Sequence, residues 1–504
     1  MGHLDPDLIS PDNSPRLTGG SGRHAIDAGL ATAFPCGLIV FAAVVALQVV
    51  LALIHSPWRD ETEALLVARL PPGRLFAMLH YEGHPSLWYL LLAAASKVSA
   101  SPIVLQVAQA LIAVGFQAIL WRKAPFSWPM KLLISLGYFL VFEYGVIARN
   151  YGLGVLLFFG FVALRRTRWS WLLLALMCNT AVHLEMLAGV GALLLVFVER
   201  RWSWSGAALL LVSGLIAVAS VTPAADAFPR PAAGWALGAH LARAILTMSS
   251  DIAPVQVGSY PAVWLWRPPT PVAWVLGALT PIAGVFVLRR DWRLAGAYLL
   301  FCLGLIVIGV AIYPIQVRHA GLIVVLLIGL LWIQKDLTGA EPGMVARVWL
   351  VSLAAGGLWI AGCSIVQPFS YARPLADWVR ERKLADAPWA ALPGFLGTDL
   401  TGELGRPTFN VQKQCWNTYQ RWNYDYDDRP NGVALGQRLE DFAQSAGPAY
   451  LITDAPLDAG PEVRTQLLAR FSGAMFAGTD PNPDLRVYRI DPARLTPRTL
   501  PTCP

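Results

Sequence analysis

The sequence predicts an α-helical polytopic membrane protein with about eleven spans, short juxtamembrane or re-entrant helices at the outer leaflet, and a small C-terminal α/β domain. Hydrophobic residues make up 56% of the 504 residues and charged residues only 14%, whereas a soluble domain carries roughly 25% charged residues. Apolar runs of spanning length, or close to it, recur along the chain up to Val366. Beyond Val366 the composition becomes polar and the apolar runs shorten.

The predicted spans are uninterrupted apolar segments, which lie at 34–54, 102–121, 130–148, 151–164, 169–182, 185–199, 204–222, 271–288, 294–313, 319–334 and 346–366. Residues 1–33 are polar and lack the pattern of a cleaved signal, so we expect a cytoplasmic tail followed by a retained signal-anchor. Residues 34–366 are the predicted transmembrane domain, with outer loops at 55–101 and 223–270. Residues 367–504 are the predicted extracytoplasmic domain.

Loop charge predicts the orientation. Alternate short linkers are rich in Arg and Lys, which is typical of cytoplasmic loops; they contain Arg122 and Lys123, Arg165 to Arg168, Arg200 and Arg201, Arg289 to Arg293, and Lys335 with Arg347. The stretch Pro85–Lys97 is apolar but only about thirteen residues long, short of a span. A full span there would reverse the charge pattern, so we expect it to dip into the outer leaflet or to lie along it. Residues 63–80 predict one or two amphipathic helices, joined at Pro71-Pro72-Gly73.

This orientation places chemically active side chains from distant stretches on one face. They are Asp60, Glu61, Glu63, His80, Glu82, His84, Glu143, Arg149, His183, Glu185, Arg318 and His319. Charges beside lipid are costly unless they pair, bind a ligand or react. Asp60 and Glu61 are placed to act as a general base or to bind a metal; the alternative is an interfacial pair that neutralises Arg59.

The other candidates also have two interpretations each. His80 and His84 have the i, i+4 spacing of two zinc ligands, but Gly83 and Pro85 disfavour a continuous helix. Hydrogen bonding to a phosphate or sugar hydroxyl is preferred to zinc binding, and interfacial packing of His80 is preferred to both. Arg149 and Arg318 suit a bidentate phosphate contact. The alternative for Arg149 is a cation that reaches the lipid headgroups or pairs with Glu143. His183 and Glu185 are either pocket residues or a satisfied pair.

The C-terminal domain shows three features. Residues 370–383 predict a helix, Ala449–Thr453 and Leu485–Ile490 predict strands, and Pro461–Phe471 has helical spacing. Cys415 and Cys503 are either free or bridged, since an oxidising compartment permits a disulfide. The aromatic run Trp416–Asp428 either stacks on a sugar ring or forms an ordered surface loop.

Together, these motifs resemble the GT-C class of membrane glycosyltransferases, in particular the bacterial relatives of protein mannosyltransferases and of the lipopolysaccharide sugar transferases. The motifs that carry the resemblance, over about residues 30–335, are Arg59-Asp60-Glu61, His84-Pro85-Ser86-Leu87-Trp88-Tyr89, Glu143-Tyr144, Ala148-Arg149-Asn150-Tyr151, His183 and Arg318-His319. Family members often have proline at the positions of Ser86 and Asn150, and some have a phosphate-binding lysine near His84 that is missing here. These departures leave the sugar and the acceptor open.

The resemblance implies an enzyme of the bacterial inner membrane whose active site faces outward. It would transfer a sugar from a polyprenyl-phosphate donor to a lipid, glycan or protein acceptor, with no role for nucleic acid. Asp60 would be the base, with Glu61 supporting it. The residues that would bind donor or acceptor are His84, Glu143, Arg149, Tyr151, His183, Arg318 and His319. If a metal takes part, Asp60 would hold Mg²⁺ or Mn²⁺.

Three rival functions stay open. A transporter or lipid flippase predicts charges at mid-membrane and inverted repeats, and the sequence has neither feature. A polysaccharide polymerase or ligase would use a late outer loop, for which the 223–270 loop offers Arg230, His240, Arg243 and Arg267. A scaffold would bind a partner through its outer domain.

Overall fold

The computed structural model describes residues 22–227, 237–254, 270–423, 429–461, 463–475, 484–496 and 498–503, with side chains from Cys36 onward. The chain divides into two units, Met1–Ala43 and Val44–Pro504. All contacts given below lie within the second unit.

Within the described residues, seven helical segments are long and apolar enough to cross a membrane. They are Cys36–Ile54 of α1 (Gly22–Ile54), α5 (Val104–Lys123), α10 (Trp204–Val221), α12 (Thr270–Val287), α13 (Trp292–Ala311), Val317–Thr338, which comprises α14 (Val317–Ala320) and α15 (Leu322–Thr338), and α16 (Met344–Val366). Each coincides with a segment predicted from the sequence. The chain therefore has the helices of a polytopic membrane protein.

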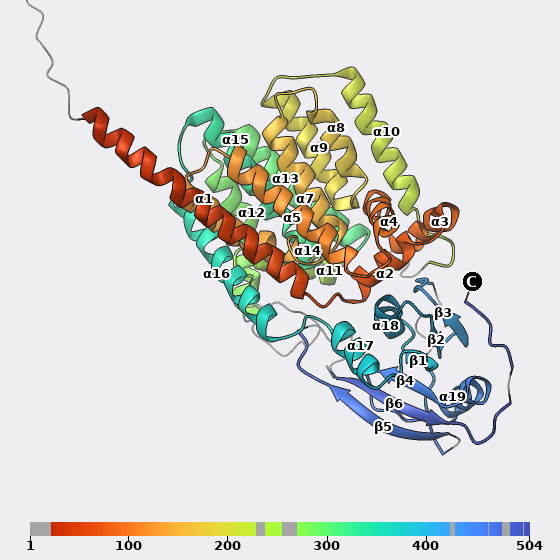
Figure 1. The fold of residues 1–504 in the computed structure, drawn as a ribbon. Helices are drawn as coiled ribbons and strands as arrows, with labels where there is room; N and C mark the ends of the chain where they lie inside the picture. The colour runs from red at the N-terminus through yellow and green to blue at the C-terminus, as the bar shows by residue number, and fades with distance from the viewer. Residues whose placement is uncertain are drawn as a thin grey trace, which may run out of the picture. The chain divides into compact units, whose positions relative to one another are not determined.

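The other four predicted spans are shorter helices. They are α6 (Trp128–Leu136) with the π-helix η1 (Phe139–Glu143), α7 (Asn150–Leu164), α8 (Ser170–Cys178) and α9 (Val182–Phe197). Three of these short helices share a bundle with longer ones: α7, α8, α9, α13 and α15 pack in a closed ring, each against the next (Figure 1). These protein contacts bury part of the surface of the short helices, which a full-length span would expose to lipid.

The segment 55–101, which is the predicted first outer loop, is helical. It contains α2 (Arg59–Ala68), α3 (Pro72–Glu82) and α4 (Leu87–Val98), which confirms the predicted helices on either side of Pro71-Pro72-Gly73 and the short helix after Pro85. Gly83 ends α3 with φ 66°, a left-handed conformation that favours glycine. Helix α3 therefore stops at Glu82, two residues before His84.

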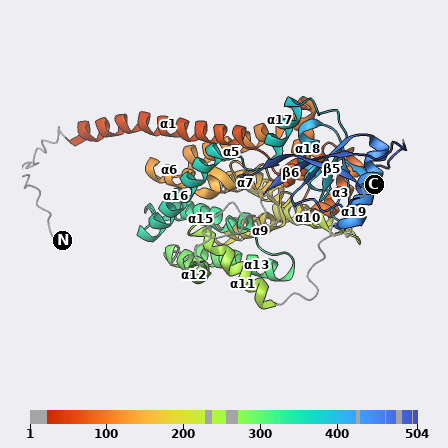
Figure 2. The same ribbon diagram turned by 90° about the horizontal axis from the view of Figure 1, so that it is seen from below.

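The predicted loop 223–270 also contains helical structure, α11 (Leu237–Met248) and the 3₁₀ turn η2 (Ser249–Asp251). Helices α11, α12 and α13 lie side by side (Figure 2). His240 is buried and its Nδ1 lies 3.2 Å from the Gly309 carbonyl oxygen, whereas Arg243 is exposed. Arg230 and Arg267 lie outside the described residues.

The C-terminal region forms a six-stranded sheet with the order β3-β2-β1-β4-β6-β5. Its strands are β1 (Trp389–Leu392), β2 (Thr408–Asn410), β3 (Cys415–Asn417), β4 (Ala449–Thr453), β5 (Arg464–Phe471) and β6 (Leu485–Asp491). Because successive strand residues face opposite sides, Ala390 and Leu392 pack with α19 (Gly432–Ala446). Trp389 and Ala391 pack with α17 (Ala372–Glu381) and α18 (Leu396–Leu404) on the other face.

The α/β organisation, the helix within 370–383 and the strands at β4 and β6 are confirmed. The predicted helix at Pro461–Phe471 is wrong, because residues Arg464–Phe471 form the edge strand β5, antiparallel to β6. Most β5 side chains are exposed, so their apolar spacing does not mark a buried helix face. Cys415 and Cys503 form a disulfide, which fixes β3 to the end of the chain.

Candidate functional site

An ion pair between Asp60 and Arg149 joins the first outer loop to the helix ring. Asp60 lies in the first turn of α2, and Arg149 immediately precedes α7. Arg149 donates through Nη1 to Oδ2 of Asp60 and through Nη2 to Nε2 of His84 at 2.8 Å. The side chains of Asp60 and Arg149 are 19% and 8% exposed, so this pair is largely shielded from solvent.

Glu61 positions this pair. Its carboxylate is fully buried and accepts hydrogen bonds from the Trp58 amide at 3.0 Å, from His55 at 2.8 Å and from the Ala148 amide at 2.5 Å. The first of these bonds caps the α2 N-terminus, where negative charge is favourable. The Ala148 bond fixes the residue next to Arg149. The supporting role predicted for Glu61 is consistent with this network, in which Glu61 acts on backbone geometry.

Charges around Asp60 and His84 define their protonation. Burial alone raises the pKa of Asp60, but the guanidinium groups of Arg149, Arg59 and Arg318 together hold this pKa below its usual value. Burial, together with Arg149 and Arg318, lowers the pKa of His84 well below its usual range. The site thus holds an ionised carboxylate beside a neutral imidazole whose Nε2 accepts from Arg149.

Tyr151, His319 and His183 form a cluster of aromatic rings next to His84. The ring of His84 meets Tyr151 edge-on at 6.1 Å between centroids. His319 accepts from the Gln316 amide at Nδ1 (3.1 Å), so its Nε2 carries the proton and donates to the Tyr151 hydroxyl at 2.8 Å. His183 stacks on His319 with centroids 3.9 Å apart. Nε2 of His183 is buried and has no hydrogen-bond partner within the described residues.

Arg318 supplies the second cation. Its carbonyl oxygen accepts from the Tyr144 hydroxyl at 2.7 Å, which fixes the backbone at the start of α14. The Arg318 side chain hydrogen-bonds the Tyr151 side chain, and its Nε is buried without a partner among the described residues. A guanidinium in this state can accept an anion such as phosphate, which guanidinium groups bind through paired hydrogen bonds.

Three predicted outer-face residues lie away from this cluster. Glu143 is buried in the π-helix η1 and accepts from the Tyr138 hydroxyl at 2.8 Å, whereas the ion pair of Arg149 is with Asp60. His80 contacts the Thr222 carbonyl oxygen at 2.7 Å and does not share a helix with His84, because α3 ends at Gly83. Glu185 lies in α9 against Gly214.

Glu63 and Glu82 form an acidic pair to which the sequence assigned no role. Glu63 is 1% exposed; its Oε1 accepts from the Gln420 amide at 2.7 Å, and its Oε2 has no partner among the described residues. Glu82 accepts from the Tyr89 hydroxyl at 3.0 Å. Burial raises the pKa of Glu82 to about 7. The Tyr89 hydrogen bond opposes this rise, and the negative charge of Asp60 adds to it. Burial and the Glu82 charge raise the pKa of Glu63 well above its usual value.

The Glu63–Glu82 pair predicts a loss of stability as the pH rises. Because the folded-state pKa of Glu82 lies above that of an unfolded glutamate, its stabilising contribution is complete below about pH 4.5 and is lost as the pH passes about 7. We expect Glu82→Gln to raise stability at pH 8 by on the order of 1–2 kcal/mol and to change it little at pH 5. Thermal unfolding of the detergent-solubilised protein at both pH values measures this, with the exposed Glu381→Gln as the control. Equal stability of Glu82→Gln and the parent at pH 8 would contradict it.

Searches against family models, curated proteins and solved structures find no match for this chain. Within the described residues, no group of three or more His, Cys, Asp or Glu side chains is arranged to hold a metal ion. The Asp60 carboxylate is bonded to two guanidinium groups, those of Arg149 and Arg59. These cations occupy the oxygen atoms that a divalent metal would need, so the donor set does not fit Mg²⁺ or Mn²⁺.

Proposed function

We propose that this protein transfers a sugar from a polyprenyl-phosphate donor to an acceptor at the outer face of the bacterial inner membrane. The observation that carries the proposal is the convergence of Asp60, Arg149 and Arg318. One carboxylate and two guanidinium groups from distant parts of the chain act on one another beside apolar helices. This combination suits a reaction in which a hydroxyl or amine loses a proton and a lipid phosphate departs.

In the proposed reaction, Asp60 takes the proton from the acceptor hydroxyl or amine. The acceptor atom forms a bond to the anomeric carbon from the side opposite the phosphate, so the configuration is inverted. The bond between that carbon and the phosphate oxygen breaks, and its electron pair leaves with the polyprenyl phosphate. Arg149 and Arg318 stabilise the negative charge that develops there. No step uses a metal.

The Asp60–Arg149 ion pair would make donor binding precede proton transfer. Without donor, Arg149 holds Asp60 ionised and lowers its basicity. A donor phosphate would compete for the same guanidinium group, because phosphate and carboxylate both accept its paired N–H groups. Donor binding would loosen Asp60 from Arg149 and raise its pKa. The base would therefore become effective after the donor is in place.

His84, Tyr151, His183 and His319 would line the donor or acceptor position. His84 is neutral and His319 donates to Tyr151, so these rings offer hydrogen bonds and stacking surfaces without adding charge. Such surfaces suit the hydroxyl groups and apolar faces of a sugar.

The test uses membrane vesicles of known sidedness that contain the protein, supplied with polyprenyl-phosphate sugars labelled in the sugar. We expect the label to be transferred to an acceptor in vesicles in which the extracytoplasmic face of the protein is exposed to the donor. An equal amount of polyprenyl phosphate should be released. Vesicles without the protein are the control. Label that crosses the membrane while still bonded to its lipid would contradict the proposal and indicate a flippase. Transfer of a whole polymer chain from a lipid pyrophosphate, without use of the monophosphate donors, would indicate a ligase.

A further inference from the structure

The C-terminal domain packs directly on the helix that carries Asp60. Helix α18 lies against α2, and the two backbones are close where Gly402 faces Thr62. A Cβ atom at Gly402 would lie 2.1 Å from Cγ2 of Thr62, so a larger residue at Gly402 requires Thr62 or the helices to shift. The sheet domain is therefore seated against the proposed catalytic loop.

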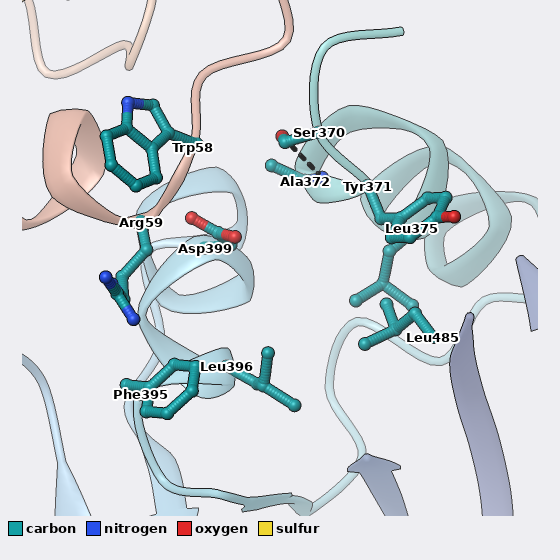
Figure 3. Close-up of a pocket in the computed structure, with 10 residues that line it drawn as sticks. All are labelled: Trp58, Arg59, Ser370, Tyr371, Ala372, Leu375, Phe395, Leu396, Asp399 and Leu485. Carbon is teal, nitrogen blue, oxygen red and sulfur yellow. Dashed lines mark hydrogen bonds between the residues drawn. The ribbon is translucent and has the colours of Figure 1, made fainter. Parts of the chain in front are cut away.

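Two aromatic side chains of this domain and one of the segment before α2 enclose Arg59, the residue before Asp60. Cζ of Arg59 lies 4.7 Å from the ring centroid of Phe395, 5.0 Å from that of Trp422 and 5.8 Å from that of Trp58. Phe395 and Trp422 are stacked on each other, with centroids 6.3 Å apart. Figure 3 shows the Arg59 guanidinium beside Phe395, at the edge of a pocket that also holds the Asp399 carboxylate. We name Phe395, Trp422 and Trp58 the aromatic cage.

The caged Arg59 reaches the proposed base. Its Nε donates to Oδ1 of Asp60 at 3.1 Å, and the Arg59 side chain is only 16% exposed. The other carboxylate oxygen of Asp60 accepts from Arg149. The two guanidinium groups thus fix both oxygens of Asp60. Arg149 does so from the residue before α7, and Arg59 does so from the first turn of α2, where it lies against the C-terminal domain.

Further contacts join the 420–423 segment to the segments 55–101 and 223–270. The Gln420 amide donates to Glu63, Arg421 pairs with Asp226 at 3.1 Å, and Asn423 forms an isolated β-bridge with Ala227. Trp422 lies between these anchors. Its ring is therefore held over Arg59 by bonds on both sides along the chain.

We propose that the C-terminal domain positions the base of the proposed transferase, with Phe395 and Trp422 holding Arg59 so that Arg59 orients Asp60. Phe395 and Trp422 are positioning residues that act through Arg59. Cations over aromatic faces are held by the ring quadrupole as well as by packing, and the cage restricts a side chain that is otherwise flexible. This inference rests on the proposed function and adds a requirement for the domain that lies outside the helices.

The test compares Phe395→Ala and Trp422→Ala with Trp378→Ala in the purified full-length protein. Trp378 also packs on an arginine, with Cζ of Arg382 4.3 Å from its ring centroid, but not on Arg59. We expect each cage variant to lower kcat by about ten- to a hundredfold, the scale of a small misplacement of a reacting group, with little change in the donor KM. Trp422→Phe should recover most of the activity, and Trp378→Ala should match the parent.

The pH profile separates positioning from a general loss of structure. Arg59 lowers the pKa of Asp60, together with Arg149 and Arg318 and against the effect of burial, and Glu82, Glu63 and Asp399 also interact with these charges. A displaced Arg59 leaves Asp60 a higher pKa, so the acid limb of kcat should move to higher pH, as in Arg59→Gln. If an alanine variant does not fold, Trp422→Leu and Phe395→Leu keep apolar bulk without the ring and take its place.

Parent-like kcat and pH profile in both cage variants would overturn this inference. So would losses in Trp378→Ala as large as those in the cage variants. These outcomes differ from a failure of the proposed function, in which the parent protein itself would show no sugar transfer.

Discussion

Replacing Asp60 with asparagine is expected to lower sugar transfer by about a hundred- to ten-thousandfold, the usual contribution of a general base. Asparagine keeps the size of the side chain and one acceptor oxygen for Arg149 or Arg59, but it does not take up the acceptor proton. Because the two guanidinium groups lose their counter-ion, a modest fall in stability should accompany the loss. Initial rates with a labelled polyprenyl-phosphate sugar measure the effect.

Asp291→Asn is the matched control for Asp60→Asn. Asp291 also lies at the start of a helix and pairs with an arginine, Arg293, at 2.6 Å, and asparagine is an equally good N-cap. Asp291 lies in a linker of the predicted cytoplasmic set, so its variant should transfer sugar at the parental rate. Parental turnover in Asp60→Asn, with normal expression, would remove Asp60 from the mechanism.

Replacing Arg149 with lysine is the second large effect that we expect, a fall in kcat/KM of about ten- to a thousandfold. Lysine keeps the positive charge but cannot bond Asp60 and His84 at once, as Arg149 does through two nitrogen atoms. It also loses the paired contact that a donor phosphate would use. Donor titrations of kcat/KM measure this effect.

Arg293→Lys is the control for Arg149→Lys, because Arg293 also contacts both oxygens of an aspartate. We expect it to leave kcat/KM unchanged. If Arg149→Lys had parental kcat/KM for the donor, the role of Arg149 as a phosphate ligand would be wrong.

The long helices follow directly from the sequence, because an uninterrupted apolar run of about twenty residues has few alternatives to a spanning helix. The segment 130–148 is equally apolar but does not form one helix. Helix α16 passes so close to the end of α6 that a Cβ at Gly357 would lie 1.9 Å from the Leu136 carbonyl oxygen. That contact joins residues more than two hundred positions apart, and no local pattern in 130–148 indicates it.

In the candidate site, too, the sequence pattern indicated some features, whereas others depend on long-range contacts. The positions of Asp60, Arg149 and Arg318 at the ends of apolar runs marked them as candidates, because charges there need a partner or a ligand. Their geometry depends on Glu61, whose carboxylate joins the backbone at Trp58 to that at Ala148. An aromatic run that includes Trp422 suggested a stacking surface for a sugar, but in the structure Trp422 lies over Arg59. The cation that an aromatic ring covers is determined by tertiary contacts, which the local sequence does not indicate.

We propose that one outward-facing pocket holds a lipid phosphate between Arg149 and Arg318, within reach of Asp60. An electron cryomicroscopy structure of the full-length protein in lipid nanodiscs with polyprenyl phosphate tests it most directly. We predict phosphate density in contact with both guanidinium groups, and Asp60 turned from Arg149 toward the acceptor side. Density for the phosphate at the cytoplasmic ends of the helices, or an Asp60–Arg149 pair unchanged beside a phosphate bound elsewhere, would contradict the claim.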